Sequence, residues 1–175
     1  MIDSPFEKNA SNEGNVQKGV SSLQKSYLCA IKLLTKKDYS EYKLSQKLLL
    51  RGFSPEDINA TIDQLKIKNL LREDDYCELK IKGMMQRNYS PEYILASLSR
   101  EKINISKEQI EKIFWDHKVT SKIQIKKIFE KKLRNLTSIS QKDINRALNR
   151  ALSKGHSLAL AKECIATYTT ESEDY

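Results

Sequence analysis

An internal repeat constrains the fold of this 175-residue chain more than any other feature. Residues 39–44, Tyr-Ser-Glu-Tyr-Lys-Leu, align with residues 89–94, Tyr-Ser-Pro-Glu-Tyr-Ile, at a shift of 50 (89 − 39). Residues 53–58 align with 105–110 at a shift of 52, and Gly-Phe-Ser at 52–54 aligns with Gly-His-Ser at 155–157 at a shift of 103 (155 − 52). A period of about 50 residues or less indicates an array of supersecondary units. The sequence therefore predicts three successive copies of one unit.

Each unit carries apolar residues at helical spacing and residues typical of helix starts and helix ends. In the first unit, Ser40 and Ser54 stand where N-cap oxygens accept from exposed backbone N–H groups. Pro55 follows at the first helical position, and Gly52 suits a C′ residue with positive φ. We expect helices near 22–37, 40–51 and 54–68, then near 73–87, 90–101 and 106–118. The third unit has three apolar stripes, which begin at Ile125, Ile144 and Leu158.

The predicted fold class is therefore all-α, with three tandem three-helix repeats stacked into an elongated, curved array. Scarce Gly (5) and Pro (3) leave little room for β-hairpins. The expected divisions are a disordered N-terminal tail (1–20), repeat one (21–71), repeat two (72–120), repeat three (121–168) and an acidic C-terminal tail (169–175).

Charge and cysteine content narrow the class of protein. The formal charge of +8 favours an anionic partner such as nucleic acid, although a basic protein without such a partner stays open. Three widely separated cysteines fit neither a disulfide framework nor a zinc site, so we expect a cytoplasmic protein. The sequence has no signal segment and no apolar stretch that predicts a membrane span.

No constellation typical of an enzyme is present. The sequence has no nucleophile–base pair, phosphate-binding glycine loop or metal spacing. Residues 73–75 (Glu-Asp-Asp) fall in a first helical turn, where acids complement the helix dipole. His156 takes the repeat position of Phe53 and is expected to pack between helices, while His117 suits a helix C-terminus. We predict neither an enzyme nor a cofactor or metal site.

Basic residues form the candidate partner site. Lys43, Lys47 and Arg51 share one helix face at i, i+4, i+8, and Arg146, Arg150 and Lys154 repeat this pattern 103 residues later. The middle repeat has Tyr93, Ser97 and Glu101 instead. A further basic run contains Lys126, Lys127 and Lys131. The alternative is that these are solvated helix faces.

The repeat motifs resemble those of the RecX family. Residues 33–71 resemble its first repeat, with the pattern Y-S-x-x-E/K-L-x-x-K-L-x-x-R-G-F. Arg-Glu-Asp-Asp-Tyr at 72–76 and Asn-Tyr-Ser-Pro-Glu-Tyr-Ile at 88–94 resemble the second, and residues 154–165 its closing motif. The resemblance covers about residues 22–168. Asp75, Asn88 and Lys102 depart from the residues usual in the family.

This resemblance implies a regulator of the RecA recombinase. Such a protein would lie in the groove of the RecA–DNA filament, contact the DNA phosphate backbone, and lower recombinase and coprotease activity in DNA repair and the SOS response. We expect a monomer. Two alternatives stay open: a stand-alone helix-turn-helix-like DNA-binding protein and a scaffold that binds only protein. Recognition helices that contact DNA usually carry more cations than these units do, which argues against the first alternative.

Overall fold

The computed structural model describes residues 21–134, 136 and 139–173, and these residues fold into nine α-helices with no strand among them. The predicted N-terminal tail, residues 1–20, lies outside this described part. The helices are α1 Ser22–Leu34, α2 Glu41–Leu49, α3 Pro55–Ile67, α4 Glu73–Gln86, α5 Pro91–Ser99, α6 Lys107–Asp116, α7 Ser121–Leu133, α8 Gln141–Ser153 and α9 Leu158–Glu173. The all-α prediction is confirmed.

Hydroxyl side chains begin most of these helices, as the sequence predicts. Ser40, Ser54 and Ser90 accept from the backbone N–H three residues later, and Pro55 and Pro91 occupy the first turn. Glycine or asparagine with positive φ ends several helices, because a left-handed residue turns the chain sharply. Gly52 has a φ of 82° and Asn88 a φ of 61°.

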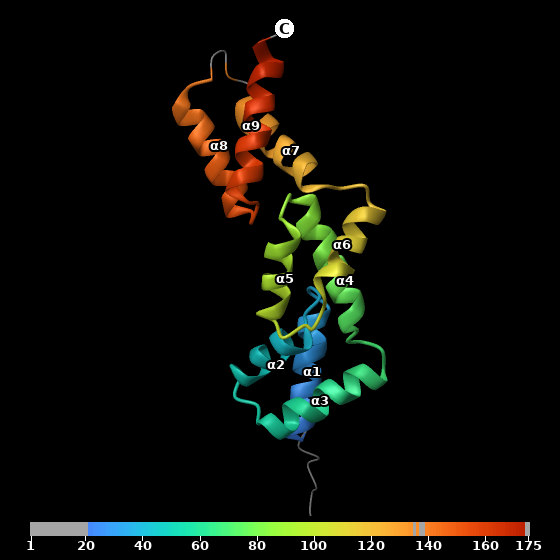
Figure 1. Cartoon of the computed structure of the whole chain (residues 1–175). Coiled ribbons are helices and arrows are strands. Elements are labelled where there is room, and N and C mark those ends of the chain that lie inside the picture. The colour runs from blue at the N-terminus through green and yellow to red at the C-terminus, as the bar shows by residue number, and fades with distance from the viewer. Residues whose placement is uncertain (1–20, 135, 137–138, 174–175) are drawn as a thin grey trace, which may run out of the picture.

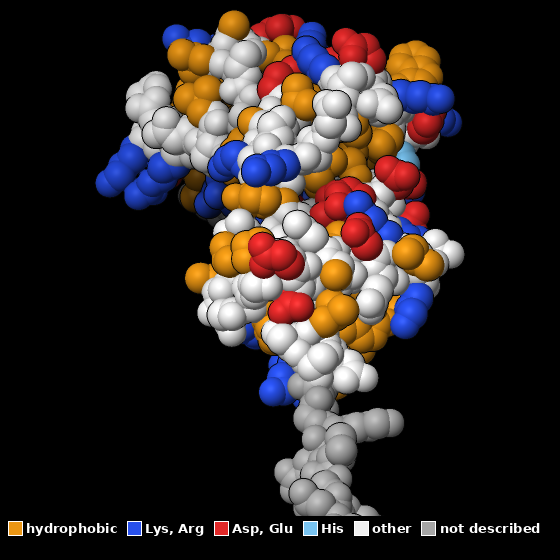
Figure 2. Space-filling model, turned by 90° about the horizontal axis from the view of Figure 1, so that it is seen from below, with side chains coloured by type: hydrophobic (Ala, Val, Ile, Leu, Met, Phe, Trp, Pro, Cys, Tyr) orange, Lys and Arg blue, Asp and Glu red, His pale blue; other side chains and the backbone are white. Residues whose placement is uncertain are grey.

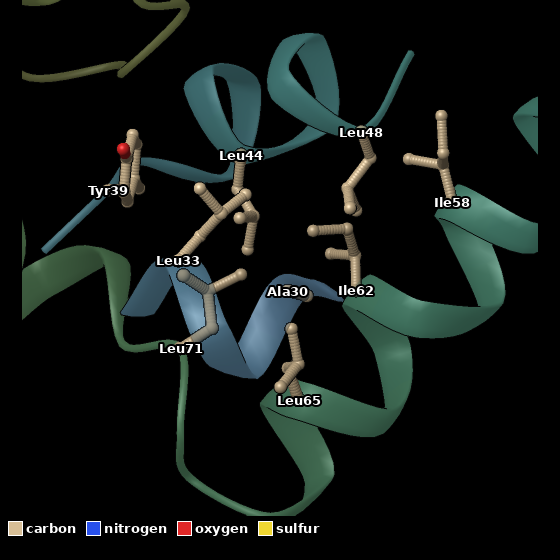
Figure 3. Packing of buried hydrophobic residues seen from close by; sticks show 9 residues of the cluster. All are labelled: Ala30, Leu33, Tyr39, Leu44, Leu48, Ile58, Ile62, Leu65 and Leu71. Carbon is tan, nitrogen blue, oxygen red and sulfur yellow. The ribbon is translucent and has the colours of Figure 1, made fainter. Parts of the chain in front are cut away.

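The helices group into three bundles, each with its own apolar core. One core joins α1–α3, a second α4–α6, and a third α7–α9. In the first, Ala30, Leu33 and Leu44 meet Ile62 and Leu65, side chains that point toward one another from three helices (Figure 3). Below we call these bundles repeats one, two and three.

The repeats follow one another along the long axis of the molecule (Figure 1). The second helix of each repeat, α2, α5 or α8, lies on the same side of this array, the left in Figure 1. The helix pairs in close contact each belong to one repeat. The repeats therefore meet through smaller junctions, and these junctions turn out to be polar.

Candidate anion-binding site

A basic hollow of about 680 Å³ lies on repeat three, between the end of α7 and the exposed face of α8. Lys132, Arg146 and Arg150 line it, with the uncharged Leu136, Asn149 and Ser153. Its one described carboxylate, Asp143, already accepts from Arg146 at 3.2 Å and caps α8. The hollow is therefore strongly cationic.

A second hollow of about 370 Å³ lies between repeats two and three. Repeat two contributes the end of α4, where Arg87 is the cation, and repeat three contributes Lys131 and Lys154. Lys132 and Arg150 line both hollows, so the two adjoin. We call the six cations of the two hollows the basic groove. They are Arg87, Lys131, Lys132, Arg146, Arg150 and Lys154.

Helix geometry explains why these cations gather. Ala147 and Ala151 are fully buried one turn apart, which leaves Arg146 and Arg150 exposed along α8. Lys131 and Lys132 occupy the last turn of α7, and Arg87 is the C-cap of α4. Cations at helix C-termini complement the negative end of the dipole, so their positions also stabilise the fold.

Lys154 differs from the other groove cations because it is buried. Its side chain is 7% exposed, and its Nζ lies 3.6 Å from the centre of the Tyr89 ring. The Lys154 carbonyl accepts from the Ser90 N–H at 2.9 Å, and the Gly155 carbonyl accepts from Ser90 Oγ at 2.9 Å. Cation–π and backbone contacts thus join repeat three to repeat two.

His156 and Gln124 complete this junction. His156 is buried, as expected for its repeat position, and its Nε2 lies 3.0 Å from the Asn88 carbonyl, which makes Nε2 the protonated nitrogen. Burial lowers the pKa of His156, so the ring is neutral near pH 7. Gln124 Nε2 donates to the Met85 and Tyr89 carbonyls at 3.0 and 3.2 Å. We call these contacts, with those of Lys154 and Gly155, the second junction.

The corresponding contact between repeats one and two centres on Glu101. This carboxylate is 6% exposed and accepts from Tyr76 Oη at 2.8 Å and from Lys80. From repeat one, Lys43 Nζ lies 2.5 Å away and Ser40 Oγ 3.3 Å away. These hydrogen bonds outweigh desolvation and lower the pKa of Glu101 to about 2. We call this cluster the first junction.

The structure brings together only part of the predicted basic site. Lys131, Arg146, Arg150 and Lys154 meet in the basic groove, whereas Lys43 pairs with Glu101 in the first junction. The other four predicted cations do not line the groove. Lys47 and Arg51 lie on α2, where Arg51 Nη1 donates to the Lys47 carbonyl at 2.9 Å. Lys126 and Lys127 lie on α7. All four are exposed.

Sequence reasoning missed Arg87 as a groove residue. It stands alone at the end of α4 and belongs to no basic stripe, so no local pattern marks it. Figure 2 shows a group of Lys and Arg side chains at the left, the side on which α2, α5 and α8 lie in Figure 1, and further Lys and Arg side chains elsewhere. Asp and Glu side chains are scattered over the rest of that view.

The described residues contain no group of three or more His, Cys, Asp or Glu side chains placed to hold a metal ion. Nor does any helix in the described ranges have the length and apolar character needed to cross a bilayer. The cations that line the basic groove suit an anionic ligand.

Comparisons with known proteins agree with the fold. Residues 27–65 match the family model "RecX, first three-helix domain". The chain is 31% identical over 106 residues to "Regulatory protein RecX" of Caldanaerobacter subterraneus, covering 59% of this chain and 52% of that protein. It is 24% identical over 116 residues to the protein of that name from Haemophilus influenzae strain PittEE, covering 66% and 74%. The first three curated relatives are each covered over about half of their length or less.

Solved structures share the architecture. The crystal structure of RecX from Lactobacillus salivarius superposes with a TM-score of 0.60 at 20% identity, covering 83% of this chain and 96% of that one. A second crystal structure, of a regulatory protein RecX, gives a TM-score of 0.62 at 17% identity and covers 83% and 72%. At these identities the likeness concerns the fold.

Proposed function

The chain belongs to the RecX family, and from this premise we propose that it binds the filament that a RecA recombinase forms on DNA. The protein would lie in the filament groove and lower recombinase and coprotease activity. Three observations support this: the family, the elongated array of repeats, and the basic groove. The groove carries most of the argument, because it offers several cations to a ligand that presents regularly spaced phosphates.

The groove chemistry suits a nucleic-acid backbone. Arg87, Arg146 and Arg150 present planar guanidinium groups, which bind phosphate oxygens in pairs, and the lysines add point charges. None of these contacts reads a base, so they would position the protein on DNA without sequence preference. A regulator that follows a filament along any sequence needs such binding.

The proposed mechanism is stoichiometric. The protein would occupy the filament groove and bridge neighbouring RecA protomers, with no catalysis and no nucleotide cofactor. The three stacked repeats form an elongated body (Figure 1), a shape that suits contact with more than one protomer. Positive charge would also speed its association with the filament at low salt.

The test is DNA-dependent ATP hydrolysis and strand exchange by RecA, with this protein titrated in. We expect both activities to fall as the protein approaches protomer-equivalent concentrations. Arg150→Glu combined with Lys47→Glu should weaken this inhibition at least tenfold. Lys162→Glu is the matched control, because Lys162 is an exposed α9 lysine outside the groove. It should inhibit like the unaltered protein.

Two outcomes would favour other functions. No effect on RecA, together with tight sequence-specific binding to duplex DNA, would favour a helix-turn-helix-like DNA-binding protein. Inhibition that neither salt nor the double variant weakens would favour a scaffold that contacts protein alone.

A further inference from the structure

The two junctions between repeats are built on equivalent positions that carry opposite charges. Lys102 and Gly155 are both the residue of positive φ that follows the second helix of a repeat, at a shift of 53 (155 − 102). Glu101 and Lys154, the residues just before them, therefore correspond. Both are buried, with exposed fractions of 6% and 7%. One is an acid and the other a base.

At the first junction, Glu101 supplies the negative charge that holds two repeats together. It binds Lys43 of repeat one and Lys80 of repeat two at once. Removing it would leave two ammonium groups facing each other at a buried boundary, which is unfavourable. The first junction is thus complete without a ligand.

At the second junction, the equivalent position adds positive charge. Lys154 joins Arg87 of repeat two and the three other repeat-three cations that line the inter-repeat hollow, Lys131, Lys132 and Arg150. Among the described residues that line this hollow there is no carboxylate. Like charges on the two repeats oppose their close approach.

Polar groups of the second junction are also incompletely paired. The first helices of repeats two and three align at a shift of 48, which places buried Ile125 on buried Cys77 (125 − 77). At this shift Gln124 corresponds to Tyr76 of the first junction. Within the described part of the chain, Gln124 Oε1 and His156 Nδ1 are buried without a hydrogen-bond partner. Unpaired buried polar atoms weaken an interface. Uncompensated positive charge and two unpaired buried atoms therefore distinguish this junction from the first.

We propose that a phosphate of the bound nucleic-acid backbone completes the second junction. The phosphate enters the 370 Å³ hollow, contacts Arg87 from repeat two and Arg150 from repeat three, and supplies the charge that Glu101 supplies at the first junction. Repeat three is thereby held against repeat two. This inference rests on the proposed function, since its ligand is the DNA of the filament.

Backbone amide exchange gives a local readout of the closed junction. The Ser90 N–H donates to the Lys154 carbonyl across the second junction, and the Glu41 N–H donates to Glu73 Oε1 at 3.3 Å across the first. A single-stranded oligonucleotide at about ten times its Kd should slow exchange at Ser90 about tenfold, because only the closed form binds it. Exchange at Glu41 should not change.

A second arm identifies the source of the phosphate. Inorganic triphosphate at the same phosphate concentration should slow Ser90 exchange much less than the oligonucleotide, because its phosphates are not held in a continuous backbone. Equal slowing by triphosphate would overturn the assignment to nucleic acid.

A charge reversal tests the analogy with Glu101. Arg87→Glu places a carboxylate at the edge of the hollow, so Ser90 exchange should be slow without DNA and DNA should slow it little further. Arg100→Glu is the matched control: Arg100 is the C-cap of α5 and, like Arg87, donates its Nε to the carbonyl four residues earlier. This control should keep the DNA response.

The outcomes separate this inference from the proposed function. Oligonucleotide binding, measured by fluorescence anisotropy, with unchanged Ser90 exchange refutes the closing phosphate and leaves RecA inhibition standing. Absence of any oligonucleotide binding overturns the closing phosphate, while the RecA assays decide the proposed function separately.

Discussion

Replacing Glu101 with glutamine should destabilise the first junction, because it removes the negative charge that pairs with Lys43 and Lys80. The glutamine would keep the shape of the side chain and remove its charge. Lys80, whose side chain is only 15% exposed, would lose its carboxylate partner in a buried setting, while the half-exposed Lys43 could turn to water. The loss would therefore come mainly from the inner lysine.

The pKa of Glu101 sets the scale of this effect. A fall from the ordinary 4.5 to about 2 means that the folded protein favours the charged carboxylate. At about 1.4 kcal/mol per pKa unit, this preference is about 3 kcal/mol. Partial exposure of Lys43 screens its share, so we expect Glu101→Gln to cost about 2–3 kcal/mol. For a chain of this length that lowers the Tm by roughly 5–10 °C.

The assay is urea unfolding followed by helical circular dichroism, with Glu92→Gln as the control. Glu92 pairs with Lys107 at 3.1 Å, but its side chain is 58% exposed, so its loss should cost less than about 0.5 kcal/mol. In a double-mutant cycle, Lys80→Met should offset part of the Glu101→Gln loss. Equal costs for Glu101→Gln and Glu92→Gln would refute the role of Glu101 as the centre of the junction.

Three further predictions follow from backbone geometry and titration. Gly155→Ala should lower the free energy of unfolding in urea by at least about 1 kcal/mol more than Gly52→Ala does. Both glycines have positive φ, but only at Gly155 would an added Cβ lie 2.6 Å from Tyr93 Cβ. Equal decreases for the two variants would contradict this. Lys118→Gly should stabilise the protein by about 0.5–1 kcal/mol, since Lys118 holds a φ of 53°, and a lower Tm would count against that strain. Because the pKa of Glu101 is lowered to about 2 in the folded protein, its charged form stabilises the fold above about pH 4.5, and this stabilisation is lost as the pH falls toward 2. Acid should therefore lower the free energy of unfolding of the unaltered protein by about 3 kcal/mol more than that of the Glu101→Gln variant. Parallel pH profiles of the two proteins would exclude this linkage.

Local signals made the helices predictable. N-cap serines, first-turn prolines and the positive-φ Gly52 act within a few residues of one another, so the sequence reveals them directly. Helix ends moved by up to three residues, as at α1, which ends at Leu34 rather than near 37. At the other end, α9 continues to Glu173, into the segment expected to be an acidic tail.

The junctions were not predictable, because their partners lie far apart in the chain. Glu101 stands where the outer repeats carry the last cation of a basic stripe, and only the fold brings it to Ser40, 61 residues away. Lys154 belongs to such a stripe, yet the fold buries it on Tyr89. Periodicity identifies which face of a helix is charged, but not which charged side chain another repeat will cover.

The salt dependence of filament binding tests the central claim most directly. If the six cations of the basic groove contact DNA phosphates, the logarithm of the binding constant should fall with the logarithm of salt concentration with a slope of about −4. Arg150→Glu should make this slope shallower by about one, whereas Lys162→Glu should leave it unchanged. A slope near zero, or equal changes in the two variants, would contradict the assignment of the groove to DNA.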